Sequence, residues 1–197
     1  VILNSGGANA CTGEAGYAQS VATAETVAGL IGAEPNDVAV CSTGLIGELL
    51  PLDNVLAGAK SAHEALAATA EAGTDASHAI MTTDTVKKEL ALACSIGGRT
   101  VTLGAIAKGS GMIHPNMGTM LCFVTTDCAI TREMLSEALR EVVPRTFNRV
   151  TVDGDTSTND MCAVLANGMA GNPLIEWKDD GYTVFLKALR QLCQELA

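Results

Sequence analysis

The stretch "KKELALACSIGGRTVTLGAIAKGSG" (residues 87–111) contains two apolar runs separated by Ile96-Gly97-Gly98-Arg99. Adjacent glycines between two apolar runs are typical of a β-hairpin, because glycine readily adopts the positive φ angles of a tight turn. The stretch therefore predicts two antiparallel strands in the middle of the chain, and it argues against an all-parallel sheet.

Helical and extended patterns alternate on both sides of this hairpin. Helical spacing or composition is found in residues 13–33, 56–70, 131–143 and 182–196, and strand-like runs are found in residues 1–4, 37–43, 78–85, 120–124 and 148–155. Pro144 predicts the end of the third helix, since proline cannot continue it. The mixture predicts an α/β fold in which helices are layered on mixed, partly antiparallel sheets.

Composition narrows the class of protein. The chain has 197 residues, of which 48% are hydrophobic and 17% charged, as expected for a folded domain or a tight pair of domains. The net charge of −10, with 12 basic and 22 acidic residues and no basic run, argues against nucleic acid or an anionic membrane as a partner. No apolar stretch reaches the roughly 18 residues of a spanning helix.

The cysteines and histidines show no metal-ligand or disulfide pattern. The seven cysteines include no CxxC pair, which favours a reduced, cytoplasmic chain. His63, His78 and His114 have no metal-ligand spacing, and we expect no metal site. The stretch "DGDTSTND" (153–160) lacks the spacing of a calcium loop, so we interpret it as a capped turn that packs against the site.

Small polar clusters stand at the ends of several apolar runs. They are Asn4-Ser5-Gly6-Gly7, Ser42-Thr43-Gly44, Thr82-Thr83-Asp84, Lys108-Gly109-Ser110-Gly111 and Gly118-Thr119. Each can be ordinary turn chemistry, since turns favour these residue types. Strand ends are also where loops converge on a site. A threonine can act as a nucleophile without histidine if its own α-amino group is the base, which requires cleavage of the preceding peptide bond.

Five motifs, in order along nearly the whole chain, carry a family resemblance. They are "NSGGANACTGEAG" (4–16), "CSTGLIGELLP" (41–51), "IMTTDT" (80–85), "AKGSGMIHPNMGTML" (107–121) and "DGDTSTND" (153–160). Together they resemble the ornithine acetyltransferase family of arginine biosynthesis, also called bifunctional glutamate N-acetyltransferase/amino-acid acetyltransferase. The resemblance implies a layered sandwich similar to N-terminal-nucleophile (Ntn) hydrolases, and a precursor that cleaves itself into an α and a β chain.

The resemblance also implies where the chain is cut and how long the whole protein is. The cut would fall between Gly118 and Thr119, so residues 1–118 would be the C-terminal part of the α chain and residues 119–197 the N-terminal part of the β chain. Many members have alanine before the threonine, and glycine here is a departure. We expect the family's residues before Val1 and after Ala197 to be missing from this chain.

The resemblance assigns roles to named residues. Thr119 would be the nucleophile, Thr43 and Gly44 would form the oxyanion hole, and Lys108 with a threonine of the "TTD" segment, Thr82 or Thr83, would bind the substrate. The implied reaction moves an acetyl group from N2-acetylornithine to glutamate through an acetyl-threonine, without a cofactor. Whether acetyl-CoA is also a co-substrate stays open. The implied assembly is a heterotetramer of two α and two β chains.

Two alternatives stay open at this point. β-Peptidyl aminopeptidases have a similar fold and also cleave themselves before the nucleophile, but they hydrolyse where the transferases pass the acyl group to an acceptor. The chain could also be a catalytically inert fragment that serves only in assembly. Thr119 and Lys108 argue against an inactive relative, but they do not exclude an inert truncation.

Overall fold

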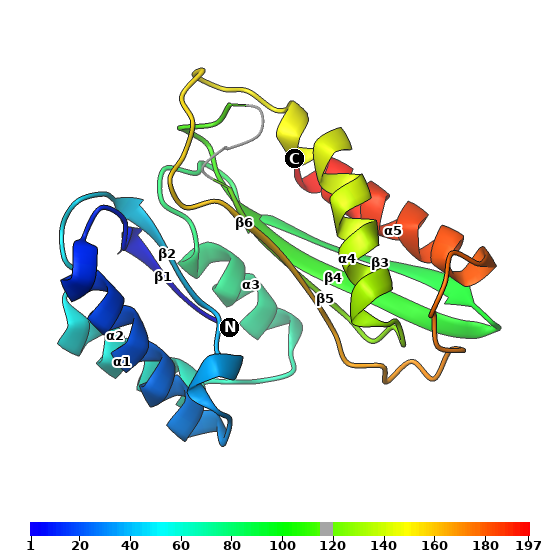
Figure 1. Ribbon diagram of the computed structural model, residues 1–197, viewed down its shortest axis with the longest axis horizontal. Helices are drawn as coiled ribbons and strands as arrows, with labels where there is room; N and C mark the ends of the chain where they lie inside the picture. Colours follow the sequence, from blue (N-terminus) through cyan, green and yellow to red (C-terminus); the bar gives the residue numbers. More distant parts are fainter. Residues whose placement is uncertain (115–119) are drawn as a thin grey trace. The chain divides into compact units, whose positions relative to one another are not determined.

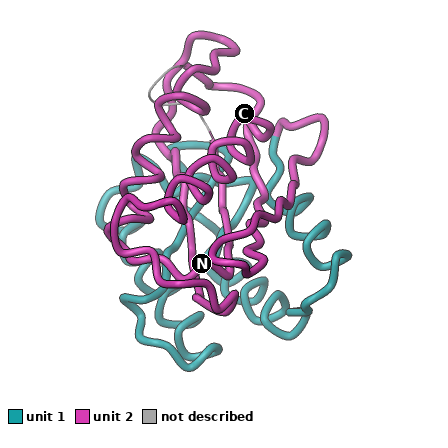
Figure 2. The backbone as a smooth tube through the Cα atoms, turned by 90° about the vertical axis from the view of Figure 1, so that its right-hand side faces the viewer, with its two compact units in different colours: residues 1–82 teal, residues 83–197 magenta. Residues whose placement is uncertain are grey.

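The computed structural model describes residues 1–114 and 120–197. The chain divides into two compact units, Val1–Thr82 and Thr83–Ala197, each of which has its own sheet (Figure 2). No helix in the described ranges is both long and apolar enough to cross a membrane.

The first unit is built around a pair of parallel strands (Figure 1). Its elements are β1 (Ile2–Gly7), α1 (Gly13–Ile31), a 3₁₀ turn (Pro35–Asp37), β2 (Val40–Leu45), α2 (Leu52–Glu64) and α3 (Ala70–Ala79). Parallel strands cannot be joined by a tight turn, and α1 provides the crossover between β1 and β2. Val27 and Ala28 of α1 pack with Ala59 of α2 and with Val38, and these four buried residues form the core of the unit.

One strand predicted in this unit is wrong. Residues 78–85 do not form a strand, because α3 extends to Ala79 and the backbone after it is irregular. The helix begins where the Thr69 side chain accepts a hydrogen bond from the Ala72 N–H at 3.1 Å. Such a cap satisfies an amide that a helix start leaves unpaired. Gly73 lies inside α3, and the helix predicted over residues 56–70 is α2, which begins at Leu52 and ends at Glu64.

The second unit contains a four-stranded mixed sheet in the order β3-β4-β5-β6. The strands are β3 (Lys88–Ile96), β4 (Arg99–Lys108), β5 (Leu121–Thr126) and β6 (Met161–Ala166). The β3–β4 and β4–β5 pairs are antiparallel, and the β5–β6 pair is parallel. The predicted hairpin is confirmed: Gly97 and Gly98 form its turn with φ angles of +58° and +75°.

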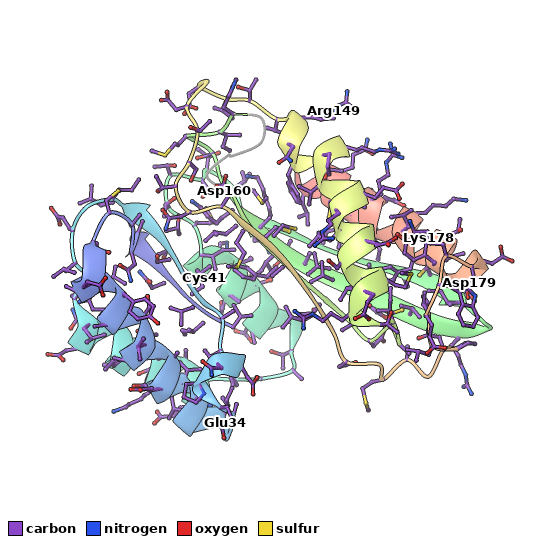
Figure 3. All side chains as sticks on the ribbon, viewed as in Figure 1. Glu34, Cys41, Arg149, Asp160, Lys178 and Asp179 are labelled. Carbon is purple, nitrogen blue, oxygen red and sulfur yellow. The ribbon has the colours of Figure 1, made fainter. Side chains whose placement is uncertain are left out.

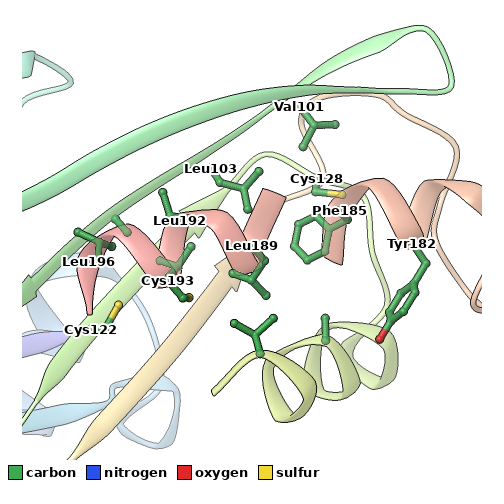
Figure 4. Close-up of a cluster of buried hydrophobic side chains, with 14 of the residues drawn as sticks. Val101, Leu103, Cys122, Cys128, Tyr182, Phe185, Leu189, Leu192, Cys193 and Leu196 are labelled. Atoms are coloured by element: carbon green, nitrogen blue, oxygen red, sulfur yellow. The ribbon is translucent and has the colours of Figure 1, made fainter. Parts of the chain in front are cut away.

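Two helices, α4 (Arg132–Val142) and α5 (Asp180–Leu196), supply the other half of the core of this unit. Figure 4 shows Phe185, Leu189 and Leu192 of α5 beside the strand residues Val101 and Leu103, and all five have 0% exposure. The apolar positions of β4 alternate with exposed ones, as in a strand with one buried face. The predicted α/β class with layered helices and mixed, partly antiparallel sheets is confirmed.

The strand predicted over residues 148–155 is wrong. Residues 147–149 form a 3₁₀ turn and the backbone that follows is irregular. The Val152 N–H does donate to the Ile113 carbonyl at 2.9 Å, but the Asp153 side chain accepts the next bonds, from the Ile113 and Met112 amides. The Asp153 side chain thus takes the place of the backbone hydrogen bonds that a paired strand would make. The strand beside β5 is formed later, by Met161–Ala166.

Candidate active site

Lys108 is the last residue of β4, and its side chain is among the largest buried ones, with 2% exposure. It lies in register with Leu121, the first residue of β5. Because Lys108 ends an apolar strand, its side chain lies in the interior, and the charge of its ammonium must be compensated there. A buried ammonium is costly unless it has charged or hydrogen-bonding partners.

Four influences set the protonation of Lys108. Burial is the largest and lowers the pKa of the ammonium below its ordinary value; Asp84 raises this pKa, Lys88 lowers it, and Asp160 raises it. Two carboxylates and one further lysine therefore influence the same charge. Such an arrangement, in which burial and specific charge partners act on one group, is common at functional sites.

A cavity of about 120 Å³ adjoins these groups. Lys88, Lys108 and Asp160 contribute charged side chains to its lining, and Ile113, Val143, Phe147 and Leu196 are among its apolar residues. A mostly apolar cavity with a few charged groups is the usual form of a small-molecule site. The ammonium of Lys108 is suited to bind a carboxylate as a compact positive charge.

Asp160 lies just ahead of β6 (Figure 3) and binds the start of β5. Its Oδ1 accepts a hydrogen bond from the Met120 N–H at 3.0 Å. No donor among residues 1–114 and 120–197 completes a hydrogen bond of standard geometry to its buried Oδ2. Burial raises the pKa of this carboxyl, against the lowering effects of Met120, Ser157 and Lys108. In sequence, Met120 directly follows Thr119.

The "TTD" segment meets the Lys108 loop through two contacts. The hydroxyls of Thr83 and Ser110 are 3.0 Å apart, and Asp84 Oδ1 accepts from the Gly109 N–H at 2.6 Å. Thr83 is exposed, which suits a residue that meets a ligand. Two of the five polar clusters singled out in the sequence are therefore neighbours in this unit. Thr82 is the last residue of the other unit and is also exposed.

The turn predicted at residues 153–160 holds the loop that follows Lys108. Asp153 accepts hydrogen bonds from the main-chain amides of Met112 and Ile113, and from that of Asp155 within the turn. The bond from Met112 is the main cause that keeps the pKa of the Asp153 carboxyl below its ordinary value. The segment is a turn that packs against the Lys108 loop, in line with the interpretation from its sequence.

Thr43 and Gly44 lie on β2 in the first unit. The Thr43 side chain is buried, at 1% exposure, and Gly44 pairs with Gly6 of β1. Gly44 has a φ of +133°, and a Cβ at this position would lie 2.3 Å from the carbonyl carbon of Gly6. Only glycine fits such a close approach of two backbones. Gly44 therefore has a structural reason to be glycine, and the oxyanion role of Thr43 and Gly44 stays a prediction.

The predicted cleavage site and nucleophile, Gly118 and Thr119, lie outside the described residues. Sequence reasoning did not assign roles to three charged residues that the structure places with Lys108, namely Asp84, Lys88 and Asp160. Asp84 and Asp160 both occur inside quoted motifs. The available signal was a carboxylate among small polar residues at the end of an apolar run.

Relatives of known name match the chain over its whole length. Residues 1–197 match the ArgJ family. The chain is 64% identical over 197 residues to the "Arginine biosynthesis bifunctional protein ArgJ" of Bifidobacterium longum, and 51% identical to the protein of the same name from Bacillus subtilis. In both cases the match covers 100% of this chain and 48% of the relative. The chain thus spans about half the length of these curated relatives.

Two crystal structures resemble the chain in fold and sequence. The arginine biosynthesis bifunctional protein ArgJ of Bacillus halodurans is 44% identical with a TM-score of 0.54, covering 58% of this chain and 59% of that one. The ornithine acetyltransferase of Mycobacterium tuberculosis, solved in complex with ornithine, is 44% identical with a TM-score of 0.51, covering 58% and 60%. The match to the family over every residue is decisive, and this chain belongs to the ArgJ family.

Proposed function

We propose that the protein containing this chain transfers an acetyl group from N2-acetylornithine to glutamate in arginine biosynthesis. The observation that carries this proposal is the match of all 197 residues to the ArgJ family. The names of the relatives, arginine biosynthesis bifunctional protein and ornithine acetyltransferase, support it. The buried Lys108 beside a small cavity supports it from the structure, since both proposed substrates carry a carboxylate.

The proposed reaction proceeds in two half-reactions. The Thr119 hydroxyl attacks the acetyl carbonyl of N2-acetylornithine, and its proton passes to the α-amino group that cleavage after Gly118 has freed. The amide C–N bond breaks, the ornithine nitrogen takes the proton, and an acetyl ester remains on the threonine. The amino group of glutamate then attacks this ester, and the threonine oxygen recovers a proton as N-acetylglutamate leaves.

Two further groups act on the charges that arise in this sequence. Thr43 and the Gly44 N–H would donate hydrogen bonds to the oxyanion of each tetrahedral intermediate. Lys108, with Thr82 or Thr83, would hold the amino-acid portion of the substrate. No cofactor is needed, because the acetyl group moves between an ester and two amides. We further propose a cytoplasmic enzyme of two α and two β chains.

An acetyl-transfer assay on the full-length protein tests the proposal. The protein is incubated with acetyl-labelled N2-acetylornithine alone, and then with glutamate. The expected results are one acetyl mass on the β chain at Thr119 with release of ornithine and, after glutamate is added, labelled N-acetylglutamate. Free acetate in place of N-acetylglutamate would identify a hydrolase, and no turnover at all would identify an inert module. A parallel reaction with labelled acetyl-CoA as the donor shows whether the enzyme also acetylates glutamate from acetyl-CoA.

A further inference from the structure

Asp84 is a buried carboxylate in direct contact with the Lys108 loop, with a side-chain exposure of 1%. Its Oδ1 accepts from the Gly109 N–H at 2.6 Å and lies 3.5 Å from the Lys88 Nζ. Lys88 in turn donates to the Gly109 carbonyl. Both polar groups of the Gly109 backbone, directly after Lys108, are thus bound by this carboxylate–lysine pair.

The pair also acts on the charge of Lys108. Burial lowers the pKa of Lys108 and the like charge of Lys88 lowers it as well, while Asp84 is the largest influence that raises it. Asp160 acts in the same direction as Asp84, but more weakly. Asp84 is therefore the stronger of the two carboxylates that oppose the effects of burial and of Lys88 on this pKa.

We propose that Asp84 is a positioning residue of the acetyl-transfer reaction: bound to the Gly109 N–H and to Lys88, it fixes both the backbone and the charge balance next to Lys108, and so presents this residue to the substrate carboxylate. The inference rests on the proposed function, because it assumes that Lys108 binds a substrate. Asp84 is the third residue of the "TTD" segment. The resemblance gave a role in this segment only to a threonine, Thr82 or Thr83.

The two parts of this role can be separated by substitution. In Asp84→Asn the side-chain oxygen can still accept from the Gly109 N–H, but the negative charge is gone. Lys108 carries its charge below its pKa and loses it as the pH rises through that value. A lower pKa in Asp84→Asn therefore moves the loss of substrate binding to lower pH.

A matched control is Asp127, which contacts the other end of β4. Asp127 accepts from the Thr102 N–H of β4 at 2.7 Å, so its carboxylate binds a main-chain amide as that of Asp84 does, but Asp127 is not among the groups named as setting the pKa of Lys108. Asp127→Asn removes an equivalent charge and keeps an equivalent hydrogen bond. We expect it to leave the pH dependence of KM where it is in the unsubstituted protein.

The experiment measures kcat and KM for N2-acetylornithine as a function of pH in the full-length protein. We expect the rise of KM at alkaline pH to begin at lower pH in Asp84→Asn, because the nearby negative charge that raises the Lys108 pKa is lost. The kcat at saturating substrate should change little. If KM rises at the same alkaline pH in Asp84→Asn and in the unsubstituted protein, the proposal is overturned.

A second variant covers the case in which Asp84→Asn does not fold. Lys88 is partly exposed, at 29% of its side chain, and Lys88→Gln removes the like charge near Lys108. The Lys108 pKa should then rise, and the alkaline limb should move to higher pH. A limb that stays in place in Lys88→Gln would show that these neighbours do not control the charge of Lys108.

A direct measurement separates this inference from the proposed function. The Lys108 pKa can be followed by NMR of the side-chain ammonium, assigned with Lys108→Arg, in the absence of substrate. If the protein proves to have another activity, the pKa in Asp84→Asn still falls below that of the unsubstituted protein. If acetyl transfer is found but this pKa is equal in the two proteins, the role of Asp84 is refuted and the function stands.

Discussion

Gly44→Ala should destabilise the first unit through a collision of backbones. An ideal Cβ at residue 44 would lie 2.3 Å from the Gly6 carbonyl carbon, 2.4 Å from the Gly6 oxygen and 2.7 Å from the Gly7 nitrogen, whereas ordinary contacts begin at 3.4 Å. The neighbouring atoms belong to the paired strand β1, so no flexible side chain can move to make room. The two strands would have to separate by about 1 Å, enough to weaken the hydrogen bonds between them.

The cost has two parts. The φ of +133° is unfavourable for alanine, at about 1–3 kcal/mol. Weakening two strand hydrogen bonds adds about 2 kcal/mol, at roughly 1 kcal/mol each. Gly47→Ala is the matched control, because Gly47 has a φ of +90° but a Cβ there would meet no atom within 4 Å. Gly44→Ala should therefore be less stable than Gly47→Ala by about 2 kcal/mol.

Urea unfolding followed by far-ultraviolet circular dichroism measures both variants against the unsubstituted protein. Equal midpoints for Gly44→Ala and Gly47→Ala would refute the collision argument. The result also bears on the oxyanion hole, since a loss of activity in Gly44→Ala would report the distorted strand pair as well as any lost hydrogen bond.

Substitutions at three further positions test the proposed chemistry in the full-length protein. Thr119→Ala should abolish both cleavage and acetylation, as measured by mass spectrometry. Thr119→Ser should retain part of each, because its hydroxyl remains. An active Thr119→Ala protein would show that Thr119 is not the nucleophile. Lys108→Ala should raise KM for N2-acetylornithine about 10- to 100-fold, since a charged hydrogen bond contributes about 1.5–3 kcal/mol; an unchanged KM would exclude Lys108 from substrate binding. Thr43→Val should lower kcat about 100-fold if its hydroxyl stabilises the oxyanion; steady-state kinetics that match the unsubstituted protein would contradict that role.

Local sequence signals predicted those elements whose boundaries are set by neighbouring residues. The β3–β4 hairpin depends on Gly97 and Gly98, and the start of α4 depends on Thr131, whose hydroxyl accepts from the Met134 N–H. Both are contacts within a few positions, which residue type and spacing describe well. Pro144 likewise lies two positions after the last residue of α4, Val142.

The failures occurred where distant contacts decide the structure. The alternation of Val150 and Val152 resembles a strand, yet Asp153 binds amides about 40 positions earlier and replaces the ladder. In residues 78–85 the apolar and β-branched pattern suggested a strand, but helix α3 and an irregular turn occupy them. Pattern reasoning cannot find such partners in a single sequence.

The candidate site shows the same division. Lys108 was identified because a lysine interrupts apolar and small residues, which is a local signal. Its charged neighbours Asp84 and Asp160 are 24 and 52 positions away in the sequence, and the pairing of β3, β4, β5 and β6 brings their segments to the end of β4. The motifs contained these carboxylates, but not their connection to the lysine.

The position of β5 in the sheet has a consequence for the order of synthesis, folding and cleavage. A cut after Gly118 would leave β3 and β4 in one chain and β5, β6, α4 and α5 in the other. The pairing of β4 with β5, from Leu103–Thr126 to Lys108–Leu121, would then hold two molecules together, and so would the core that α5 shares with β3 and β4. The interface between α and β chains would be the interior of a domain, and the pieces could not part without unfolding. Folding as one precursor keeps this assembly unimolecular, so a denatured, already cleaved enzyme should recover at a rate that depends on its concentration.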